Sequence, residues 1–494
     1  MDKQELYKYS YYNLHSHSFY SNCRMLDATM SPKQLIDTAY QCGLKGIAIT
    51  DHEMLGAHVK LATYLKSRQD KGKMKDFKLM FGNEIYLVSK EQIEKARENN
   101  NKTRFYHFIL IAKNEHGYEF LRKQSTRAWK NSFWFRGMQR VPTYKDELKE
   151  MMKEYKGDVI ASTACIGSEM NQLSLEIYDE CANDDDELDI DKVKKSKSFE
   201  KVIEYINFMQ NVFGEDNFYF ELQPSHNRDQ LIVNKLILLY SKWFNIRYTI
   251  TTDAHYARPE DAPIHETFLK SRNSDRDVSK FYATTYIFKP EELSEYFNDD
   301  IMTNAFKTTH DIASQVEHFT FYHSAIIPRA KIPEKFLNDV PLVKLDSIRV
   351  FVESLEKQGL SVKQYNYINK YLSATNASDK YYMYLILNGL LSKVKNITEK
   401  HLARINIELE QIYEISQQIN QHMSGYFLAE LDFMNEMWKV SILGPARGSA
   451  ACFYTNYLLG IVQVDALKYD LKWWRFLSKE RVGDFPDEQL QRLA

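Results

Sequence analysis

The chain has 494 residues, of which 44% are apolar and 27% charged, and its formal net charge is −2. This length and apolar content allow two or more domains with full hydrophobic cores. Because the net charge gives no overall attraction to nucleic acid, any binding to phosphate backbones would depend on local patches or metal ions.

Cysteine usage and the N-terminal sequence point to a reducing compartment. The five cysteines are an odd number, widely spaced and without a Cys-x-x-Cys pair, so a disulfide framework is not expected. No apolar stretch approaches the roughly 20 residues needed to span a bilayer, and residues 1–5 are too polar for a secretory signal. We therefore expect a cytoplasmic protein with no membrane partner.

From residue 12 to about 270, short β-like runs alternate with amphipathic helical runs, a rhythm typical of an α/β barrel. The helix between the first two strands is the best delimited. Ser31 is a suitable N-cap, Pro32 suits the first helical position, and Gly43 can end the helix. Strands are expected at 44–50, 105–112, 158–163, 218–222 and 248–252.

Potential metal ligands recur at or near the ends of these strands. They begin with His15-Ser16-His17 and finish with Asp253-Ala254-His255. Because side chains alternate between the two faces of a strand, His-x-His and Asp-x-His each place both ligands on one face. In α/β barrels the chemistry gathers at the C-terminal ends of the strands. Further acids, histidines and a cysteine near such ends are Asp27, Asp51, His52, Glu84, His107 and Cys165.

The segment 123–140 has a composition suited to binding a nucleic-acid strand. It contains five cations, four aromatic residues and no acid, and cations can hold phosphates while aromatic rings stack on bases. The alternative is an amphipathic helix whose aromatic residues belong to the core, and the sequence favours neither. Under the first interpretation the DNA contacts include Arg127, Lys130, Arg136 and Arg140.

After about residue 275 the rhythm changes to longer helical stretches, expected at 344–357, 378–394 and 399–422. We therefore predict a first domain over 1–275 and a second over 276–494.

A Gly-rich turn in the second domain, 444–449, is expected to lead into an apolar helix over 450–460. Its backbone N–H groups, the helix N-terminus, Arg447 and the Ser449 hydroxyl together suit a phosphate. On its own this pattern is not specific to one function.

Taken together, several motifs resemble the polymerase and histidinol phosphatase (PHP) domain, in order and in spacing. They are Leu14-His15-Ser16-His17-Ser18, Thr50-Asp51-His52, Gly82-Asn83-Glu84, Tyr106-His107 and Thr252-Asp253-Ala254-His255-Tyr256. The runs 164–169 and 255–262 are more narrowly similar to the bacterial replicative DNA polymerase III alpha subunit, and 424–428, 444–451 and 480–482 to its palm. The resemblance covers nearly the whole chain. It implies an α/β fold: a distorted (β/α)7-type PHP barrel, then an incomplete α+β polymerase palm rich in helices.

The resemblance also implies a metal site that hydrolyses phosphoesters, in the family's terms a 3′–5′ exonuclease. Imidazole, thiolate and carboxylate ligands together suit zinc or manganese, with up to three ions. The alternative is a structural barrel in which the same side chains only brace the fold. The implied ligands are His15, His17, Asp27, His52, Glu84, His107, Cys165, Asp253 and His255.

Carried over from the palm, Arg447, Gly448 and Ser449 would contact the triphosphate of an incoming nucleotide. The family usually has glycine where Ala446 stands, so the alanine is strained if that position needs a positive φ. In the family, the residues after Pro486-Asp487 continue into paired aspartates that hold the catalytic magnesium ions, and here the sequence stops at Ala494. We therefore expect polymerase chemistry only with a C-terminal polymerase fragment, and DNA, dNTP and other replisome subunits as further partners.

Three functions remain open at this point. The first is the N-terminal part of a DNA polymerase III alpha subunit acting in DNA replication. The second is an autonomous PHP nuclease or phosphoesterase, which the full ligand set favours. The third is a non-catalytic DNA- or partner-binding module that competes with an intact polymerase.

Nucleotidyl transfer needs carboxylates that hold two ions about 4 Å apart, and the palm is expected to lack the second half of that site. We therefore expect that the purified chain alone does not extend a primed template supplied with magnesium and deoxynucleotides, as judged on a denaturing gel. An intact polymerase of the family serves as the positive control. Primer extension by the single chain would contradict the incomplete-palm interpretation.

Overall fold

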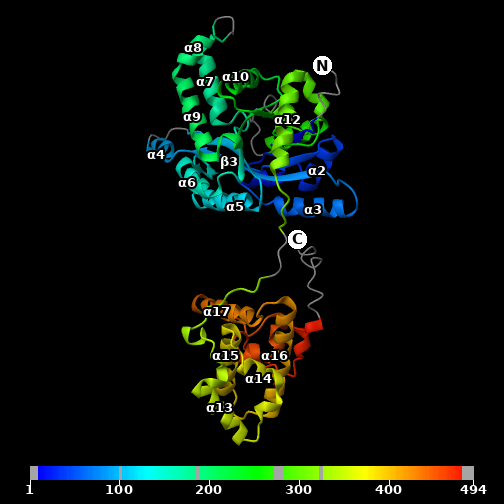
Figure 1. Ribbon diagram of the computed structural model, residues 1–494, viewed down its shortest axis with the longest axis vertical. Helices are drawn as coiled ribbons and strands as arrows, with labels where there is room; N and C mark the ends of the chain where they lie inside the picture. The colour runs from blue at the N-terminus through cyan, green and yellow to red at the C-terminus, as the bar shows by residue number, and fades with distance from the viewer. Residues whose placement is uncertain are drawn as a thin grey trace. The chain divides into compact units, whose positions relative to one another are not determined.

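The computed structural model describes residues 9–98, 103–183, 188–271, 278, 282–321 and 326–480. The chain forms two compact units that divide between Tyr322 and His323 (Figure 1). The boundary expected at residue 275 is therefore too early. Helix α12 (Asp299–Gln315) belongs to the first unit because it packs against strands β1 (Tyr12–Asn13) and β10 (Tyr248–Ile250).

The first unit is built on one sheet whose seven main strands follow the order β1-β2-β3-β4-β8-β9-β10, and β7 pairs with the end of β3. The expected strands are confirmed, and the fold is the mixed α/β barrel that the sequence predicts. The remaining bounds are β2 Gly46–Ile49, β3 Lys78–Val88, β4 Tyr106–Ala112, β7 Thr143–Tyr144, β8 Val159–Ser162 and β9 Phe218–Leu222.

One strand runs against the others. β4 pairs antiparallel with both β3 and β8, whereas the remaining neighbours along the main order pair in parallel. The N-terminal end of β4 therefore lies beside the C-terminal ends of the other strands. His107, the second residue of β4, is brought to the same end of the barrel as ligands that follow parallel strands.

The two edge strands of the sheet meet through a single bridge. Ser16 bridges Ala254 in parallel, the His17 N–H donates to the Ala254 carbonyl over 2.8 Å, and the Asn13 amide donates to the Thr252 hydroxyl over 2.9 Å. These contacts nearly close the sheet into a barrel. The residues that join its edges are neighbours of the predicted ligands, so barrel closure and the site depend on the same segments.

The barrel has an apolar floor beneath its polar end. A small core cluster takes Met80 from β3 and Ile109 and Ile111 from β4, together with Ile312 from α12. By the two-residue period of a strand, Met80 shares a face with Glu84, and Ile109 and Ile111 share one with His107. On the same face of each strand, aliphatic side chains therefore lie toward one end of the barrel and predicted ligands toward the other.

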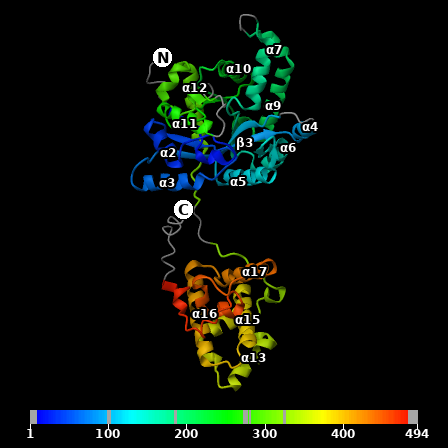
Figure 2. The ribbon, with the colours of Figure 1, turned by 180° about the vertical axis from the view of Figure 1, so that it is seen from behind.

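Helices surround this sheet on its outer side (Figures 1 and 2). α2 and α3 pack together over β2 and β3, α5 lies over β4, and α7, α9 and α10 pack against one another. A separate hairpin, β5 (Phe133–Phe135) and β6 (Met138–Arg140), follows α5. The helices are α2 Pro32–Gln41, α3 His58–Asp70, α4 Lys90–Glu98, α5 Glu115–Lys130, α6 Lys145–Tyr155, α7 Glu169–Cys181, α8 Ile190–Lys195, α9 Lys197–Phe213, α10 Arg228–Phe244 and α11 Ala262–Lys270.

The predicted signals at the ends of α2 are confirmed. The Ser31 hydroxyl accepts the Gln34 N–H, Pro32 occupies the first turn, and Gly43 adopts φ +84° just after the helix. A left-handed residue at that point lets the chain turn back toward β2.

The second unit is helix-rich, as expected, and over residues 326–480 it contains no strand. Its core is a single cluster of aliphatic and aromatic residues from all of its helices. None of the helices in the described parts of the chain is long and apolar enough to span a membrane. The helices are α13 Asp346–Lys357, α14 Asn366–Leu372, α15 Ala377–Lys393, α16 Glu399–Ile419, α17 Ser424–Val440 and α18 Tyr454–Leu459.

Helices α15 and α18 touch closely at Gly389, where a Cβ atom would lie 2.2 Å from the Leu458 carbonyl oxygen. Replacing Gly389 with alanine forces two backbones apart, which outweighs the better helix propensity of alanine. We expect Gly389→Ala to lower the free energy of unfolding by about 1–3 kcal/mol in urea titrations followed by circular dichroism. Gly444→Ala is the matched control, because nothing lies within 4 Å of its added Cβ. Equal unfolding midpoints for the two variants would contradict this packing.

Candidate metal centre

All nine predicted ligands converge at one end of the barrel. Most lie in loops that follow strands β1, β2, β8 and β10, whereas Glu84 and His107 lie within β3 and β4. Every one is buried except His107, whose side chain is 24% exposed. Seven of them form three overlapping groups, in which His17, His52 and Glu84 each belong to two groups.

The first group contains His15, His17, Glu84 and Asp253, whose ligand atoms all lie within 4.8 Å of one another. The His15 Nε2 and His17 Nε2 atoms are 3.1 Å apart, and each is 3.0 Å from Asp253 Oδ1. Glu84 Oε2 lies 3.2 Å from His17 Nε2. Two imidazoles and two carboxylates therefore point at one small volume.

The second group joins His52, Glu84 and His107. His52 Nδ1 lies 2.7 Å from Glu84 Oε2, and His107 Nδ1 lies 2.7 Å from Glu84 Oε1. Cys165 Sγ approaches the same His107 nitrogen at 3.4 Å. The two oxygens of Glu84 thus face different imidazoles, which is the arrangement of a carboxylate that bridges two ions.

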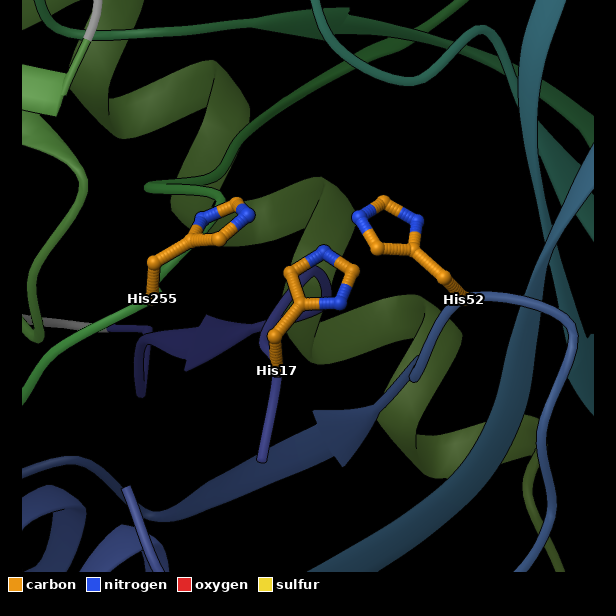
Figure 3. Close-up of side chains that lie close together, drawn as sticks. All are labelled: His17, His52 and His255. Atoms are coloured by element: carbon orange, nitrogen blue, oxygen red, sulfur yellow. The ribbon is translucent and has the colours of Figure 1, made fainter. Parts of the chain in front are cut away.

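The third group consists of His17, His52 and His255, whose rings turn toward one another from three separate segments (Figure 3). Asp27, from the loop before α2, completes it. Its Oδ2 atom lies 2.6 Å from His52 Nε2 and 3.1 Å from His255 Nε2. Asp27 and Cys165 therefore both reach the cluster, although neither belongs to a His-x-His or Asp-x-His pair.

The donor atoms of the centre are better satisfied by cations than by hydrogen bonds to one another. Both Glu84 oxygens and His52 Nδ1 are buried and have no hydrogen-bond partner, despite the short separations between them. The facing Nε2 atoms of His15 and His17 cannot both carry a proton without repulsion. A cation between such lone pairs satisfies them together, and imidazoles, a thiol and carboxylates form a ligand set suited to zinc or manganese.

A second set of contacts orients the imidazoles. Glu221 Oε1 accepts from His15 Nδ1 at 2.8 Å, and the Asp253 carbonyl accepts from His255 Nδ1 at 2.6 Å. These bonds place the protons on Nδ1 and leave the Nε2 lone pairs directed into the centre, as in known metal sites. The sequence analysis missed Glu221. An acid inside the otherwise apolar strand 218–222 is the signal that identifies it.

Two residues outside the predicted ligand set, Asp51 and His265, have structural roles at the site. Asp51 accepts hydrogen bonds from the Ser18 N–H at 2.6 Å and from the hydroxyls of Ser18 and Ser21 at 2.8 Å, and so fixes the loop after β1. His265 Nε2 donates to the Asp27 carbonyl at 2.6 Å. His58 lies apart from the centre, where its ring packs near Phe81 and burial lowers its pKa to about 3.

Electrostatics within the centre couple the acids to the histidines. Burial opposes ionisation of Asp27, but the charges of His255 and His52 outweigh it and hold the Asp27 pKa well below its usual range. The Glu84 pKa is lowered in the same way, against burial, by the surrounding imidazoles. Burial raises the pKa of the Cys165 thiol well above its usual range, and nearby carboxylates add to the shift. A thiolate at this position therefore needs a cation beside it.

The segment 123–140 matches neither of its two interpretations completely. α5 ends at Lys130, and the rest forms the β5–β6 hairpin. The Trp129 indole donates to the Glu53 carbonyl at 2.8 Å, whereas Trp134 is 74% exposed. Lys130 and Arg136 are exposed, Arg127 pairs with Glu147 at 3.0 Å, and Arg140 lies over Phe105. Binding of DNA by these cations stays a prediction.

The Gly-rich turn of the second unit differs from its expected form. The helix predicted over 450–460 is instead a 3-10 turn, Gly448–Cys452, followed by the six-residue α18. Glu408 already accepts the Tyr454 and Thr455 N–H groups, at 2.7 and 2.8 Å, so the helix N-terminus is not free for a phosphate.

The residues predicted to contact a nucleotide, Arg447, Gly448 and Ser449, are exposed. Ala446 does not have a positive φ, whereas Gly448 has φ +66°. The alanine is therefore compatible with this backbone and carries no strain of the kind considered above. Nucleotide contact by the turn stays a prediction.

The fold and the clustered ligands define the class of the first unit, a PHP domain, and the PHP family model matches residues 13–225. A second family, the bacterial DNA polymerase III alpha NTPase domain, matches residues 371–490. By sequence the chain is similar to DNA polymerase III alpha subunits, to which both matched families and its curated relatives point.

Relatives match along almost the whole chain. Probable DNA polymerase YorL of Bacillus subtilis (strain 168) is 36% identical over 492 residues, which are 96% of this chain and 36% of that protein. The DNA polymerase III subunit alpha of Borreliella burgdorferi is 29% identical over 482 residues, 96% of this chain and 34% of that protein. The chain thus spans about a third of the length of these curated relatives. Among solved structures, an amidohydrolase from Chromobacterium violaceum covers 50% of this chain and 87% of its own at 12% identity, with a TM-score of 0.29.

The contact between Glu221 and His15 generates a direct prediction. Glu221→Gln keeps the size of the side chain but weakens the hold on the His15 tautomer, so we expect the affinity for zinc to fall about 10–100-fold. Competition with a chromophoric chelator measures this affinity. The matched control is Glu215→Gln, because Glu215 is exposed just before β9. Equal zinc affinities for both variants would show that Glu221 does not orient a ligand.

Proposed function

We propose that the first unit is a metal-dependent phosphoesterase that acts as a 3′–5′ exonuclease within a DNA polymerase III alpha-type protein of DNA replication. The observation that carries the proposal is Glu84, whose buried oxygens lack hydrogen bonds among the described residues. Its Oε2 atom lies 3.2 Å from His17 of the first group, and its Oε1 atom lies 2.7 Å from His107 of the second. Zinc or manganese, in up to three sites, suits the donors. Polymerisation would need a complementing C-terminal part, magnesium, DNA and dNTP, in the cytoplasm with other replisome subunits.

The proposed ion-binding roles follow the three groups. His15, His17, Glu84 and Asp253 would hold one ion, and His52, His107 and Glu84 a second with help from Cys165. His255, Asp27 and further imidazoles would hold the third. When bound, the ions would supply Lewis acidity to a phosphoryl oxygen and lower the pKa of a water molecule toward neutrality.

The residues of the chain contribute binding, orientation and exclusion of water. All the ligands except His107 are at most 4% exposed, so their geometry is set before a substrate arrives. His107 is the exception with its exposed edge, and the side of the centre that carries His107 is where a phosphoester can approach. Glu221 holds the proton on His15 Nδ1 and keeps Nε2 directed inward.

An autonomous phosphoesterase is the second candidate function, and one observation favours it. All three ligand groups lie in the first unit, and no residue among 326–480 contributes to them. The test compares the hydrolysis rate of the chain alone with its rate after a C-terminal polymerase fragment is added. Equal rates would favour this candidate. A rate that rises with the added fragment would favour the polymerase-associated role.

Removing the first ligand pair tests the proposed activity. We expect the wild-type chain, with manganese or zinc, to release mononucleotides from the 3′ end of a labelled single-stranded oligonucleotide. The His15→Ala, His17→Ala double variant loses two ligands of the first group, so its rate should fall at least about 100-fold. His318→Ala is the control, since His318 is exposed and remote from the ligand groups. Equal rates for the double variant and the wild type would remove the proposal.

A further inference from the structure

A pocket of about 350 Å³ lies against the metal centre on the side of His107. His107 forms part of its wall, and Tyr86 and Gly167 lie beside His107 in the same wall. Tyr86 pairs with His107 across β3 and β4, and their ring centroids are 4.9 Å apart. A Cβ at Gly167 would lie 3.1 Å from the His107 ring, so the backbone packs directly on that ligand. The pocket therefore shares a wall with the cluster.

The lining of the pocket also contains two guanidinium groups. Arg24 lies 4.2 Å above the Tyr86 ring centroid, and one of its terminal nitrogens donates to the Gln139 carbonyl at 3.3 Å. Arg140, in β6, lies 5.2 Å from the Phe105 ring centroid. Arg104 adds an exposed cation to the same lining. Two aromatic rings and several cations thus face one space.

Neither Arg24 nor Arg140 forms an ion pair in the described part of the chain, although the buried Glu53 carboxyl interacts with Arg24 from beyond 4 Å. The Nε atoms of both are buried and have no hydrogen-bond partner, and no described carboxylate lies within 4 Å of either group. Burial and the nearby charge of Arg24 lower the pKa of Arg140. Like charges gathered and partly dehydrated in this way are unfavourable unless an anion joins them.

Several other arginines pair with an acid instead, although among the described residues the partly buried Arg68 also has a buried Nε without a hydrogen-bond partner. Arg258 pairs with Glu292 at 2.6 Å, Arg247 with Asp311 at 2.9 Å, and the partly buried Arg404 with Glu408 at 2.5 Å. In the pocket beside the metal centre, neither of the two partly buried arginines has such an acidic partner among the described residues.

We propose that Arg24 and Arg140 form a phosphate subsite that holds the backbone phosphate next to the phosphodiester cleaved at the metal centre. This inference rests on the proposed function. A guanidinium offers a planar fork of N–H donors that matches phosphate oxygens. The rings of Tyr86 and Phe105 lie against the two guanidinium groups, 4.2 and 5.2 Å from their centroids, and so help to position them. The substrate class is accordingly an oligonucleotide strand with at least two phosphates, and a lone phosphoester leaves the subsite empty.

Binding is tested on the full chain with chelator present, so that hydrolysis does not interfere. A labelled eight-nucleotide single strand is titrated at several salt concentrations and followed by fluorescence anisotropy. We expect the Arg24→Gln, Arg140→Gln variant to bind at least about tenfold more weakly, since charge-assisted bonds to one phosphate are lost. The slope of log affinity against log salt should fall by about 0.7, the value for one phosphate of a single strand.

Two further variants separate this subsite from general charge and from misfolding. Arg122→Gln with Arg349→Gln removes the same charge from exposed positions on α5 and α13, and we expect wild-type affinity within about twofold. Arg24→Lys with Arg140→Lys keeps the charge but loses the fork, and should bind with intermediate affinity. Zinc content equal to that of the wild type confirms that each variant is folded at the centre.

Hydrolysis distinguishes failure of this inference from failure of the proposed function. With manganese, the glutamine variant should lose at least about tenfold more kcat/KM on the oligonucleotide than on bis(4-nitrophenyl) phosphate, which has a single phosphate. Weakened binding with no hydrolysis by the wild type would support the subsite and overturn the exonuclease. Wild-type binding and salt slope in the glutamine variant, or no measurable binding by the wild type, would overturn the subsite whatever the hydrolysis result.

Discussion

The structure of the first unit depends on the electrostatic balance around Glu84. Five imidazoles and four carboxylates, counting Glu221, are packed with a thiol into a small, largely buried space. Such a set is costly when its lone pairs face one another and stable when cations separate them. The bridge between Ser16 and Ala254 closes the sheet between the two ligand pairs 15–17 and 253–255. Ion binding and closure of the barrel therefore depend on the same two segments of the chain.

The reversed strand β4 explains how this balance is reached. If β4 ran parallel to its neighbours, His107 would lie at the opposite end of the barrel from His52 and Glu84. Reversal brings it to within 2.7 Å of Glu84 Oε1, and leaves it as the ligand with an exposed edge. The same reversal places Tyr86 beside His107 and so connects the arginine pocket to the centre. One change of strand direction thus sets the ligand geometry and the approach to it.

Most of the ligands could be predicted from the sequence because they occur in short motifs with a characteristic spacing. Periodicity located the strands and capping residues located α2. Position near strand ends made Asp27 and Cys165 candidates, and the resemblance assigned them as ligands. What sequence reasoning missed depends on long-range contacts. Glu221 orients His15 across 206 positions, and Glu408 occupies the N–H groups of α18 from another helix. The boundary near 275 was placed too early because the sequence of α12 is that of an ordinary amphipathic helix. Only its contacts with β1 and β10 assign it to the first unit.

The central claim is that these scattered groups jointly hold ions, and metal stoichiometry tests it most directly. Bound metal is removed from the purified chain with a chelator, and the chain is dialysed against buffer with micromolar zinc or manganese. Elemental analysis then gives the metal concentration, which is divided by the protein concentration. The account predicts more than one and up to three equivalents per chain, in line with the three ligand groups. Less than half an equivalent of either metal, on chain shown to be folded by circular dichroism, would contradict it.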